Sequence, residues 1–340
     1  MAWVNEIYDT IYDENTVCVA CISYGKDSLA MLRAIKLLGL PLHRIVHTEV
    51  WATQTIPADL PPMVEFKAKA DKIIKDLYGI EVEHICATKS SHSVNVERER
   101  ERERATRTSS TANLIKESLS EISTDFLAKL GSGVSTSNMT EKLTYEDIFY
   151  RTVQAPRRIG NGIKRVKGGI YGFATRSAPY CTGELKTKIS KRPKNEGHKT
   201  NIIQYLGIAP DEPMRVARHI GKKDVILPLV EIGWEEPLCG LISQYQDLLS
   251  PIYTTSMRGG CWFCHNQSVG MLRLLRKNYP DLWKLLLKWD KDSPVTFHAD
   301  GHTVHDFDRR FALEDEGLIS ADEPWRWDYL TNRPIQLKLF

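Results

Sequence analysis

The chain has 340 residues, 42% of them hydrophobic, which suits one large domain or two modest ones with a sizeable core. Its 46 basic and 43 acidic residues leave a net charge of +3, which argues against a globally basic nucleic-acid-binding protein and leaves only a local patch open. The sequence contains no run of about 18 apolar residues, so it predicts no membrane span. Its N-terminus is acidic and lacks the pattern of a secretory signal peptide. Seven cysteines, an odd number, favour reduced thiols and metal chemistry over a disulfide framework, so we expect a cytoplasmic protein.

The first strong signal is a strand, a polar turn and a helix in succession. Residues 16–22 form an apolar, β-branched-rich run that predicts a buried strand, and residues 29–38 have helical periodicity. Between them lies the polar segment Ser23-Tyr24-Gly25-Lys26-Asp27-Ser28, which we name the 23–28 loop. The N–H groups and the positive dipole end of a helix N-terminus make such a junction an anion site. The alternative is a polar turn that only caps the helix.

The sequence of this loop, S-Y-G-K-D-S, resembles the S-G-G-K-D-S signature of the PP-loop pyrophosphatases, the adenine-nucleotide α-hydrolase group. That group includes the phosphoadenosine phosphosulfate (PAPS) reductases, to which later segments are also similar. The resemblance implies that all six loop residues bind ATP with Mg²⁺, with Lys26 and Asp27 in catalytic roles. Tyr24 departs from the family, which has glycine there. The loop does not match the Walker A pattern.

The following segments continue the alternation of strands and helices. Residues 44–50 predict a strand, residues 63–78 a helix that ends at Gly79, and residues 81–86 a third strand. This order predicts an α/β fold with a doubly wound, mainly parallel sheet. By resemblance it is a HUP-like PP-loop domain. Glu49, at the carboxyl end of the second strand, is a candidate nucleotide-binding residue, with a solvated strand end as the alternative.

The alternation then stops at a charged insertion, about residues 90–145. Its run ERERERER, residues 97–104, favours a solvated helix or mobile segment over a nucleic-acid contact, and residues 131–138 predict a linker. Residues 145–172 are basic and interleaved with aromatic side chains, which is typical of a polyanion-binding patch and equally of an exposed loop. The cations of this patch are Arg151, Arg157, Arg158, Lys164, Arg165 and Lys167.

Two further segments resemble the PAPS-reductase family. The first, from Cys181 to Lys186, is similar to the family's C-T-x-x-L-K, which implies that Lys186 lies near the nucleotide phosphates. The second follows a predicted strand at residues 201–206 and is similar to G-x-x-x-x-E-x-x-R. There the resemblance implies that Asp211 or Glu212 assists Mg²⁺ and that Arg215 holds phosphate or sulfate, which suits the planar guanidinium fork.

A C-x-x-C pair, Cys261 and Cys264, follows a strand expected at residues 225–230 and a helix expected at residues 235–249. Such a pair is either a metal half-site or a redox pair, or else two inert thiols. Cys181 and Cys239 are the candidates to complete a four-thiolate site for zinc or an iron–sulfur cluster, with His265 as a substitute for Cys239. Several sulfur-handling relatives bind a [4Fe–4S] cluster in this way.

Residues 271–289 predict core helices interrupted near Pro280, and the polar segment at residues 300–308 predicts a capping turn more than a second metal site. We therefore expect a nucleotide-binding domain over residues 1–230 and a mainly helical region with the C-x-x-C pair over residues 231–340.

The expected function, by resemblance, is an ATP-using enzyme that releases pyrophosphate and adenylates a substrate for sulfur transfer. The expected partners are an adenine nucleotide and a nucleic acid or a sulfur-donor protein, without a membrane. One alternative is reduction of PAPS or adenylyl sulfate, against which stands the absence of any cysteine after Cys264. Another is a nucleotide-sensing subunit associated with nucleic acid.

Overall fold

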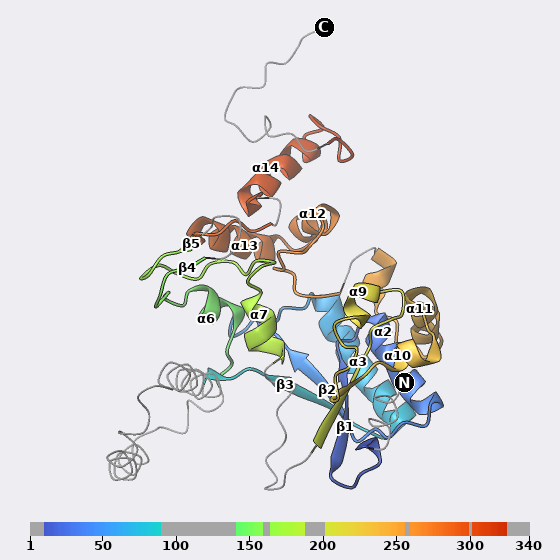
Figure 1. Ribbon diagram of the computed structural model, residues 1–340. Coiled ribbons are helices and arrows are strands. Elements are labelled where there is room, and N and C mark those ends of the chain that lie inside the picture. The colour runs from blue at the N-terminus through green and yellow to red at the C-terminus, as the bar shows by residue number, and fades with distance from the viewer. Residues whose placement is uncertain are drawn as a thin grey trace, which may run out of the picture.

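The computed structural model describes residues 10–89, 141–158, 164–187, 201–255, 259–298 and 301–324. Its centre is a five-stranded sheet with strand order β3-β2-β1-β6-β7, in which every pairing is parallel (Figure 1). The strands are β1 (Thr16–Ile22), β2 (Arg44–Glu49), β3 (Val82–Cys86), β6 (Asn201–Leu206) and β7 (Val225–Ile226). The expected α/β fold with a parallel sheet is confirmed. The charged insertion lies outside the described residues as far as residue 140.

Strand β1 is central because its side chains are apolar on both faces. Cys18 and Ala20 are fully buried, and β1 pairs with β2 on one side and β6 on the other. Helix α2 (Lys26–Leu37) follows β1 and α3 (Pro61–Tyr78) follows β2. Helix α2 begins earlier than expected because the Leu29 N–H already donates to the Gly25 carbonyl. Helix α3 ends at Gly79, whose φ of 71° is the left-handed cap that the sequence predicted.

The expected strand over residues 225–230 is wrong beyond its first two residues. Only Val225 and Ile226 pair with β6, and helix α10 (Pro228–Ile232) follows at once. Proline favours the first turn of a helix, because it lacks the N–H that a helix start leaves unpaired and its φ is already helical. Helix α11 (Glu236–Tyr245) comes next, and both helices pack against α2 (Figure 1). They therefore cover the helix that starts in the 23–28 loop.

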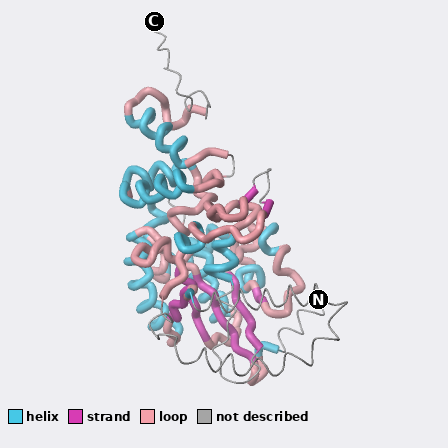
Figure 2. The backbone as a smooth tube through the Cα atoms, turned by 90° about the vertical axis from the view of Figure 1, so that its left-hand side faces the viewer, coloured by secondary structure: helices cyan, strands magenta, loops and turns pink. Residues whose placement is uncertain are grey.

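The remaining elements lie beyond the carboxyl ends of the strands, as the two views in Figures 1 and 2 show. They are α6 (Tyr145–Phe149), β4 (Arg157–Arg158), β5 (Lys164–Arg165), α7 (Tyr180–Thr182), the π-helical turn η2 (Gly183–Thr187), α9 (Pro213–Val216), the 3₁₀ turn η3 (Pro251–Thr255), α12 (Val269–Asn278), α13 (Pro280–Asp292) and α14 (Val304–Asp315). Helices α12 to α14 are stacked at one end of the molecule (Figure 1). Strands β4 and β5 form a separate antiparallel ribbon.

An aromatic core joins these outer elements to the sheet. Trp262, inside the C-x-x-C pair, stacks on Trp289 of α13 with ring centroids 5.6 Å apart. Its backbone N–H donates to the Ala58 carbonyl and its indole N–H to the Pro57 carbonyl. Phe263 packs on Tyr145 of α6 at 4.3 Å. The C-x-x-C loop is therefore held by buried aromatic side chains and by the chain segment after β2.

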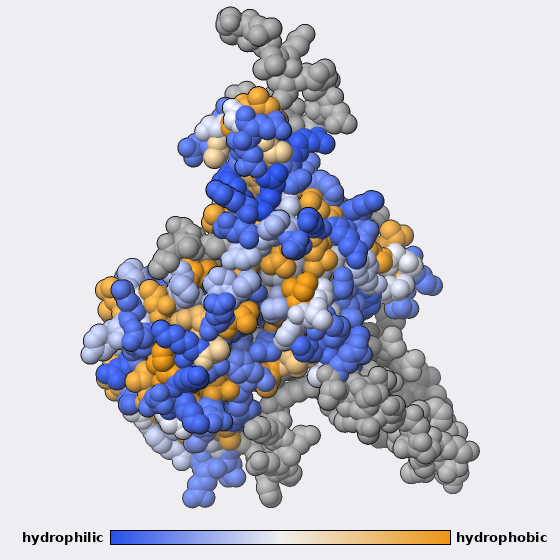
Figure 3. All heavy atoms as spheres, turned by 180° about the vertical axis from the view of Figure 1, so that it is seen from behind, coloured by the Kyte–Doolittle hydropathy of each residue, from blue (hydrophilic) through white to orange (hydrophobic). Residues whose placement is uncertain are grey.

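On the face in Figure 3, hydrophobic side chains occur in several small groups among hydrophilic ones. Among the described helices, none is long and apolar enough to cross a membrane.

Candidate functional site

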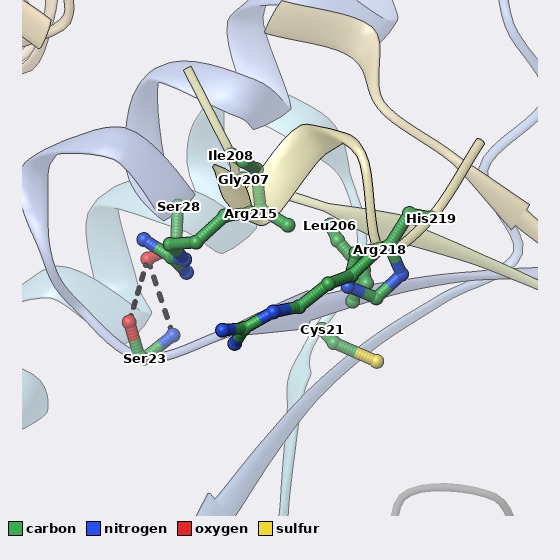
Figure 4. A pocket seen from close by; sticks show the side chains of 9 residues that line it. All are labelled: Cys21, Ser23, Ser28, Leu206, Gly207, Ile208, Arg215, Arg218 and His219. Carbon is green, nitrogen blue, oxygen red and sulfur yellow. Dashed lines mark hydrogen bonds between the residues drawn. The ribbon is translucent and has the colours of Figure 1, made fainter. Parts of the chain in front are cut away.

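A pocket of about 260 Å³ opens where β1 and β6 end (Figure 4). Its lining comes from the end of β1, the start of α2, the end of β6, and α9 with the turn after it. The lining residues are Cys21, Ser23, Ser28, Leu206, Gly207, Ile208, Arg215, Arg218 and His219. The chain leaves β1 for β2 on one side and later returns to β6 on the other, so this is the topological switch point of the sheet. Open α/β sheets bind their ligands at such a point.

Hydrogen bonds of Ser28 hold the 23–28 loop in shape. The Ser28 hydroxyl donates to the Gly25 carbonyl at 2.9 Å and accepts from the Ser23 N–H at 3.1 Å. Gly207, at the end of β6, supports the loop from the other side. A Cβ on Gly207 would lie 2.7 Å from the Ser28 Cα and 2.9 Å from the Asp27 carbonyl oxygen. Only glycine lets β6 approach the helix start this closely.

The ammonium group of Lys26 is held by two carboxylates. Its Nζ donates to Asp27 at 2.7 Å and to Glu236, on α11, at 2.8 Å. Burial lowers the pKa of Lys26, but the hydrogen bonds to Asp27 and Glu236 outweigh it and leave the pKa above its ordinary value. Burial raises the pKa of Asp27, which Lys26 partly offsets. Lys26 is thus a charged side chain at the helix start.

Tyr253, in η3, completes the surroundings of the helix start. The backbone N–H of Lys26 donates to the Tyr253 hydroxyl at 3.2 Å. A Cβ built on Gly25 would lie 3.3 Å from this hydroxyl, and one built on Gly259 would lie 4.0 Å from it. The segment before the C-x-x-C pair therefore approaches the 23–28 loop. Sequence reasoning missed Glu236 and Tyr253, since no local pattern marks side chains that reach a loop more than 200 residues away.

The side chain of Tyr24 points away from the pocket, although the resemblance implied that Tyr24 binds nucleotide. Its φ is 56°, the left-handed region that glycine favours, and its side chain is fully buried. Its hydroxyl bonds to Asp71 of α3 and lies 3.1 Å from the His84 Nε2. Only the backbone of Tyr24 is left to contact a ligand in the loop.

Glu49 is likewise engaged inside the protein and does not line the pocket. Its carboxylate bonds to the His84 ring nitrogen at 3.0 Å and to the Trp51 indole N–H at 3.2 Å. The hydrogen bond from His84 lowers the pKa of Glu49 to about 2. A second buried network lies beside it, in which the Lys67 ammonium contacts His47 at 2.7 Å and Asp59 at 2.6 Å. Burial, with the Lys67 charge, lowers the pKa of His47 to about 4.

The predicted acidic and basic residues after β6 lie at the pocket rim. Asp211 accepts hydrogen bonds from the backbone N–H of Glu236, at the start of α11. Glu212 forms an ion pair with Arg215, which lines the pocket as the sequence led us to expect. Arg218 and His219 also line it and were not predicted. The spacing in Arg-x-x-Arg was the available signal, because residues three apart lie on the same side of a helical turn.

Three of the four candidate metal-binding cysteines, Cys181, Cys261 and Cys264, lie near enough to one another and to Lys186 for their charges to interact, and we call them the cysteine group. Burial raises the pKa of Cys181 and raises that of Cys261 to about 11, and in both cases the Lys186 charge offsets part of the rise. Conversely, the negative charges of the three cysteines raise the pKa of Lys186, and Cys261 has the largest effect. Lys186, expected near the nucleotide phosphates, is thus the cation of the cysteine group and does not line the pocket.

Cys239, the fourth candidate, has different surroundings. It is fully buried on α11, its thiol points to the Trp234 carbonyl, and its ionisation is influenced by Asp27 and Lys26. Burial raises the pKa of Cys239 to about 12. The substitute candidate, His265, is buried too, and its Nε2 has no hydrogen-bond partner among the residues that the structure describes. In the part of the chain that the structure describes, no three His, Cys, Asp or Glu side chains are arranged to hold a single metal ion.

The basic patch expected over residues 145–172 is partly used within the fold. Arg151 forms a two-pronged ion pair with Glu184, and the buried Arg165 donates to the Tyr171 and Phe173 carbonyls. The side chains of Arg157, Arg158 and Lys164 lie outside those that the structure describes. The described part of the patch therefore offers less free positive charge than the sequence suggested.

We found no matching family model, no matching curated protein and no matching solved structure for this chain. A function for it therefore has to be argued from the residues and geometry of the site.

Proposed function

We propose that this chain is a PP-loop enzyme of the HUP-like, PAPS-reductase type that binds Mg-ATP, releases pyrophosphate and adenylates a substrate for sulfur transfer. The observation that carries the proposal is the pocket at the switch point, where the 23–28 loop and Arg215 face the same space. A helix N-terminus on one wall and a guanidinium group on the other suit a polyphosphate.

The chemistry follows from charge placement. An oxygen atom of the substrate attacks the α-phosphorus of ATP and forms a new P–O bond. The bond from the α-phosphorus to the bridging oxygen breaks, and its electron pair leaves with pyrophosphate. Lys26 and the N–H groups at the start of α2 stabilise the negative charge that develops there. Such groups position the reactants and neutralise charge without forming a covalent bond.

Carboxylates beside the loop fit the Mg²⁺ that accompanies ATP. Asp27 contacts Lys26, and Glu212 and Glu236 are close enough to raise the pKa of Asp27. Carboxylate oxygens are the ligands that Mg²⁺ prefers. Mg²⁺ would supply further positive charge at the phosphates, and Asp27 and Glu212 are the residues that would hold it.

The cysteine group has thiol donors that suit an iron–sulfur cluster or zinc, and the proposed sulfur transfer favours the cluster. Cys181, Cys261 and Cys264 interact electrostatically with one another and with Lys186, and cysteine thiolates are the ligands of such clusters. Cys181, Cys261 and Cys264 are the residues that would hold the cluster, which would supply a binding place for the sulfur to be transferred. Lys186 would balance the negative charge of the thiolates.

The test is ligand binding by protein purified without oxygen. Thermal unfolding is measured with Mg-ATP, adenylyl sulfate and PAPS, since a ligand at about a hundred times its dissociation constant stabilises the fold by about 2.7 kcal/mol. We expect stabilisation by Mg-ATP that is lost in Lys26→Ala and kept in Lys72→Ala, a change on the exposed face of α3. Preference for PAPS with no pyrophosphate release would contradict adenylation, and no response to any of the three would remove the nucleotide site.

A further inference from the structure

Arg215 and Arg218 approach the pocket from the same side. Arg215 lies in α9 and Arg218 in the turn after it, and the Arg218 backbone N–H donates to the Arg215 carbonyl at 3.2 Å. The helical spacing of three residues puts both side chains on one face. Figure 4 shows both guanidinium groups directed toward the end of the pocket formed by Ser23 and Ser28.

The two arginines differ in their partners. Arg215 forms an ion pair with Glu212, which neutralises its charge in the absence of a ligand. For Arg218 the described residues provide no carboxylate partner, although its side chain extends into the pocket (Figure 4). The pocket therefore carries a positive charge that no described carboxylate balances. An arginine in this position suits an anion with oxygens in one plane, which its fork binds through two hydrogen bonds.

The opposite wall indicates where that anion lies. It is formed by the 23–28 loop, at the positive end of α2, with Lys26 close by. A diphosphate between the loop and the two arginines would meet donors on both sides. The apolar lining, Cys21, Leu206 and Ile208, offers no such charge.

We propose that Arg218 is a second pyrophosphate-binding arginine, which with Arg215 holds the β- and γ-phosphates of ATP against the 23–28 loop. This inference rests on the proposed function, because it assigns the leaving group of that reaction. When the bond to the α-phosphorus breaks, the electron pair moves onto the pyrophosphate, and the Arg218 fork faces the oxygens that receive it.

The test compares the binding of inorganic pyrophosphate, AMP and Mg-ATP by isothermal titration. The proteins are the wild type, Arg218→Ala, Arg218→Lys and the control Lys288→Ala, an exposed cation on α13. We expect Arg218→Ala to bind pyrophosphate and Mg-ATP about 10- to 100-fold more weakly, the range for hydrogen bonds to a charged group. Binding of AMP should not change, Arg218→Lys should be intermediate because it keeps the charge but not the fork, and the control should match the wild type.

Because Arg218 is exposed, its replacement should leave the thermal unfolding midpoint unchanged. Unchanged pyrophosphate binding by Arg218→Ala would overturn the inference alone, provided that the wild type binds Mg-ATP. An equal loss for AMP and pyrophosphate would also overturn it, since the fork would then face the α-phosphate. If the wild type binds neither Mg-ATP nor pyrophosphate, the proposed function fails and this inference with it.

Discussion

The hydroxyl group of Tyr24 donates a hydrogen bond to Asp71, so a residue of the 23–28 loop is fastened to the middle of α3. Tyr24 has a φ of 56°, which costs a residue with a side chain about 1–2 kcal/mol. Two interactions offset that cost: the Tyr24 ring is buried against His47, with ring centroids 4.8 Å apart, and its hydroxyl is hydrogen-bonded to Asp71. The left-handed backbone conformation that glycine adopts freely is here held by an anchored aromatic side chain.

Because Tyr24 is anchored in this way, we expect two substitutions of it to differ in how much they destabilise the protein. Tyr24→Phe should lower the free energy of unfolding by about 1–3 kcal/mol, because Asp71 loses a partly buried hydrogen bond. Tyr24→Gly should lower it further, since loss of a buried aromatic ring costs about 3–5 kcal/mol and the relief of backbone strain returns only part of that. Urea denaturation measures both. A glycine variant as stable as the wild type would show that the ring anchors nothing.

The pair of Glu49 and His84 predicts a dependence of stability on pH. The pKa of Glu49 is lowered from 4.5 to about 2, so its contribution is present above 4.5 and is lost as the pH falls toward 2. The pKa of His84 is raised above 6.5, chiefly by the hydrogen bond with Glu49, so its contribution is present below 6.5 and is lost as the pH rises through the folded-state pKa. Both contributions are present together between 4.5 and 6.5.

Glu49→Gln should therefore destabilise the protein most near about pH 5.5 and less at about pH 3 or pH 8.5. Denaturation at the three pH values gives the comparison. Glu65→Gln, on the exposed face of α3, is the control and should show no such maximum. A loss that does not vary with pH would mean that the two groups are not coupled.

The close approach of Gly207 to the helix start predicts a steric effect. Gly207→Ala places a methyl group 2.7 Å from a backbone atom of Ser28, so the 23–28 loop must shift. We expect a loss of about 1–3 kcal/mol in unfolding free energy, together with weaker Mg-ATP binding. Gly270→Ala, in α12, meets no atom within 4 Å and should stabilise the protein by about 1 kcal/mol. Equal unfolding free energies and equal Mg-ATP binding in the two variants would show that Gly207 does not pack closely against the loop.

The grouping of the cysteines predicts which of them retain metal. Cys181→Ser, Cys261→Ser and Cys264→Ser should each lose most of the iron and sulfide of protein purified without oxygen, because each removes a ligand of the proposed cluster. Cys239→Ala should keep them, since the thiol of Cys239 points to the Trp234 carbonyl and its ionisation is influenced by Asp27 and Lys26. Iron and acid-labile sulfide analysis checks this. Loss of iron in Cys239→Ala to the same extent would make Cys239 a fourth ligand.

The charge of Lys186 should increase the reactivity of the Cys261 thiol in the metal-free protein. Its charge lowers the pKa of Cys261 against the effect of burial, so Lys186→Met should reduce the thiolate fraction at any pH below about 11. Each unit by which the pKa rises slows alkylation by iodoacetamide about tenfold. Lys186→Arg keeps the charge and should react as the wild type does. Mass spectrometry of the Cys261 peptide measures the rate of alkylation. An alkylation rate in Lys186→Met equal to that of the wild type would show that the lysine does not influence the thiol.

The elements that depend on local pattern could be predicted. Strands β1 and β6 have the predicted bounds, and α3 ends at Gly79, because apolar runs, helical periodicity and a glycine cap are all encoded within a few residues. The prediction of a strand over residues 225–230 was wrong because an apolar run of that length fits either a strand or a short helix. Pro228 favours the helix, which begins at that residue.

The sequence by itself determined a parallel α/β sheet with a polar loop between its first strand and a helix, since strand, loop and helix follow one another along the chain. Only the tertiary structure decided that Arg218 shares a pocket with Ser23, that Glu236 and Tyr253 meet Lys26, and that Cys239 lies apart from the cysteine group. The reason is physical. Such neighbours come from segments far apart in the sequence, and strand order and helix packing, which no local pattern records, bring them together.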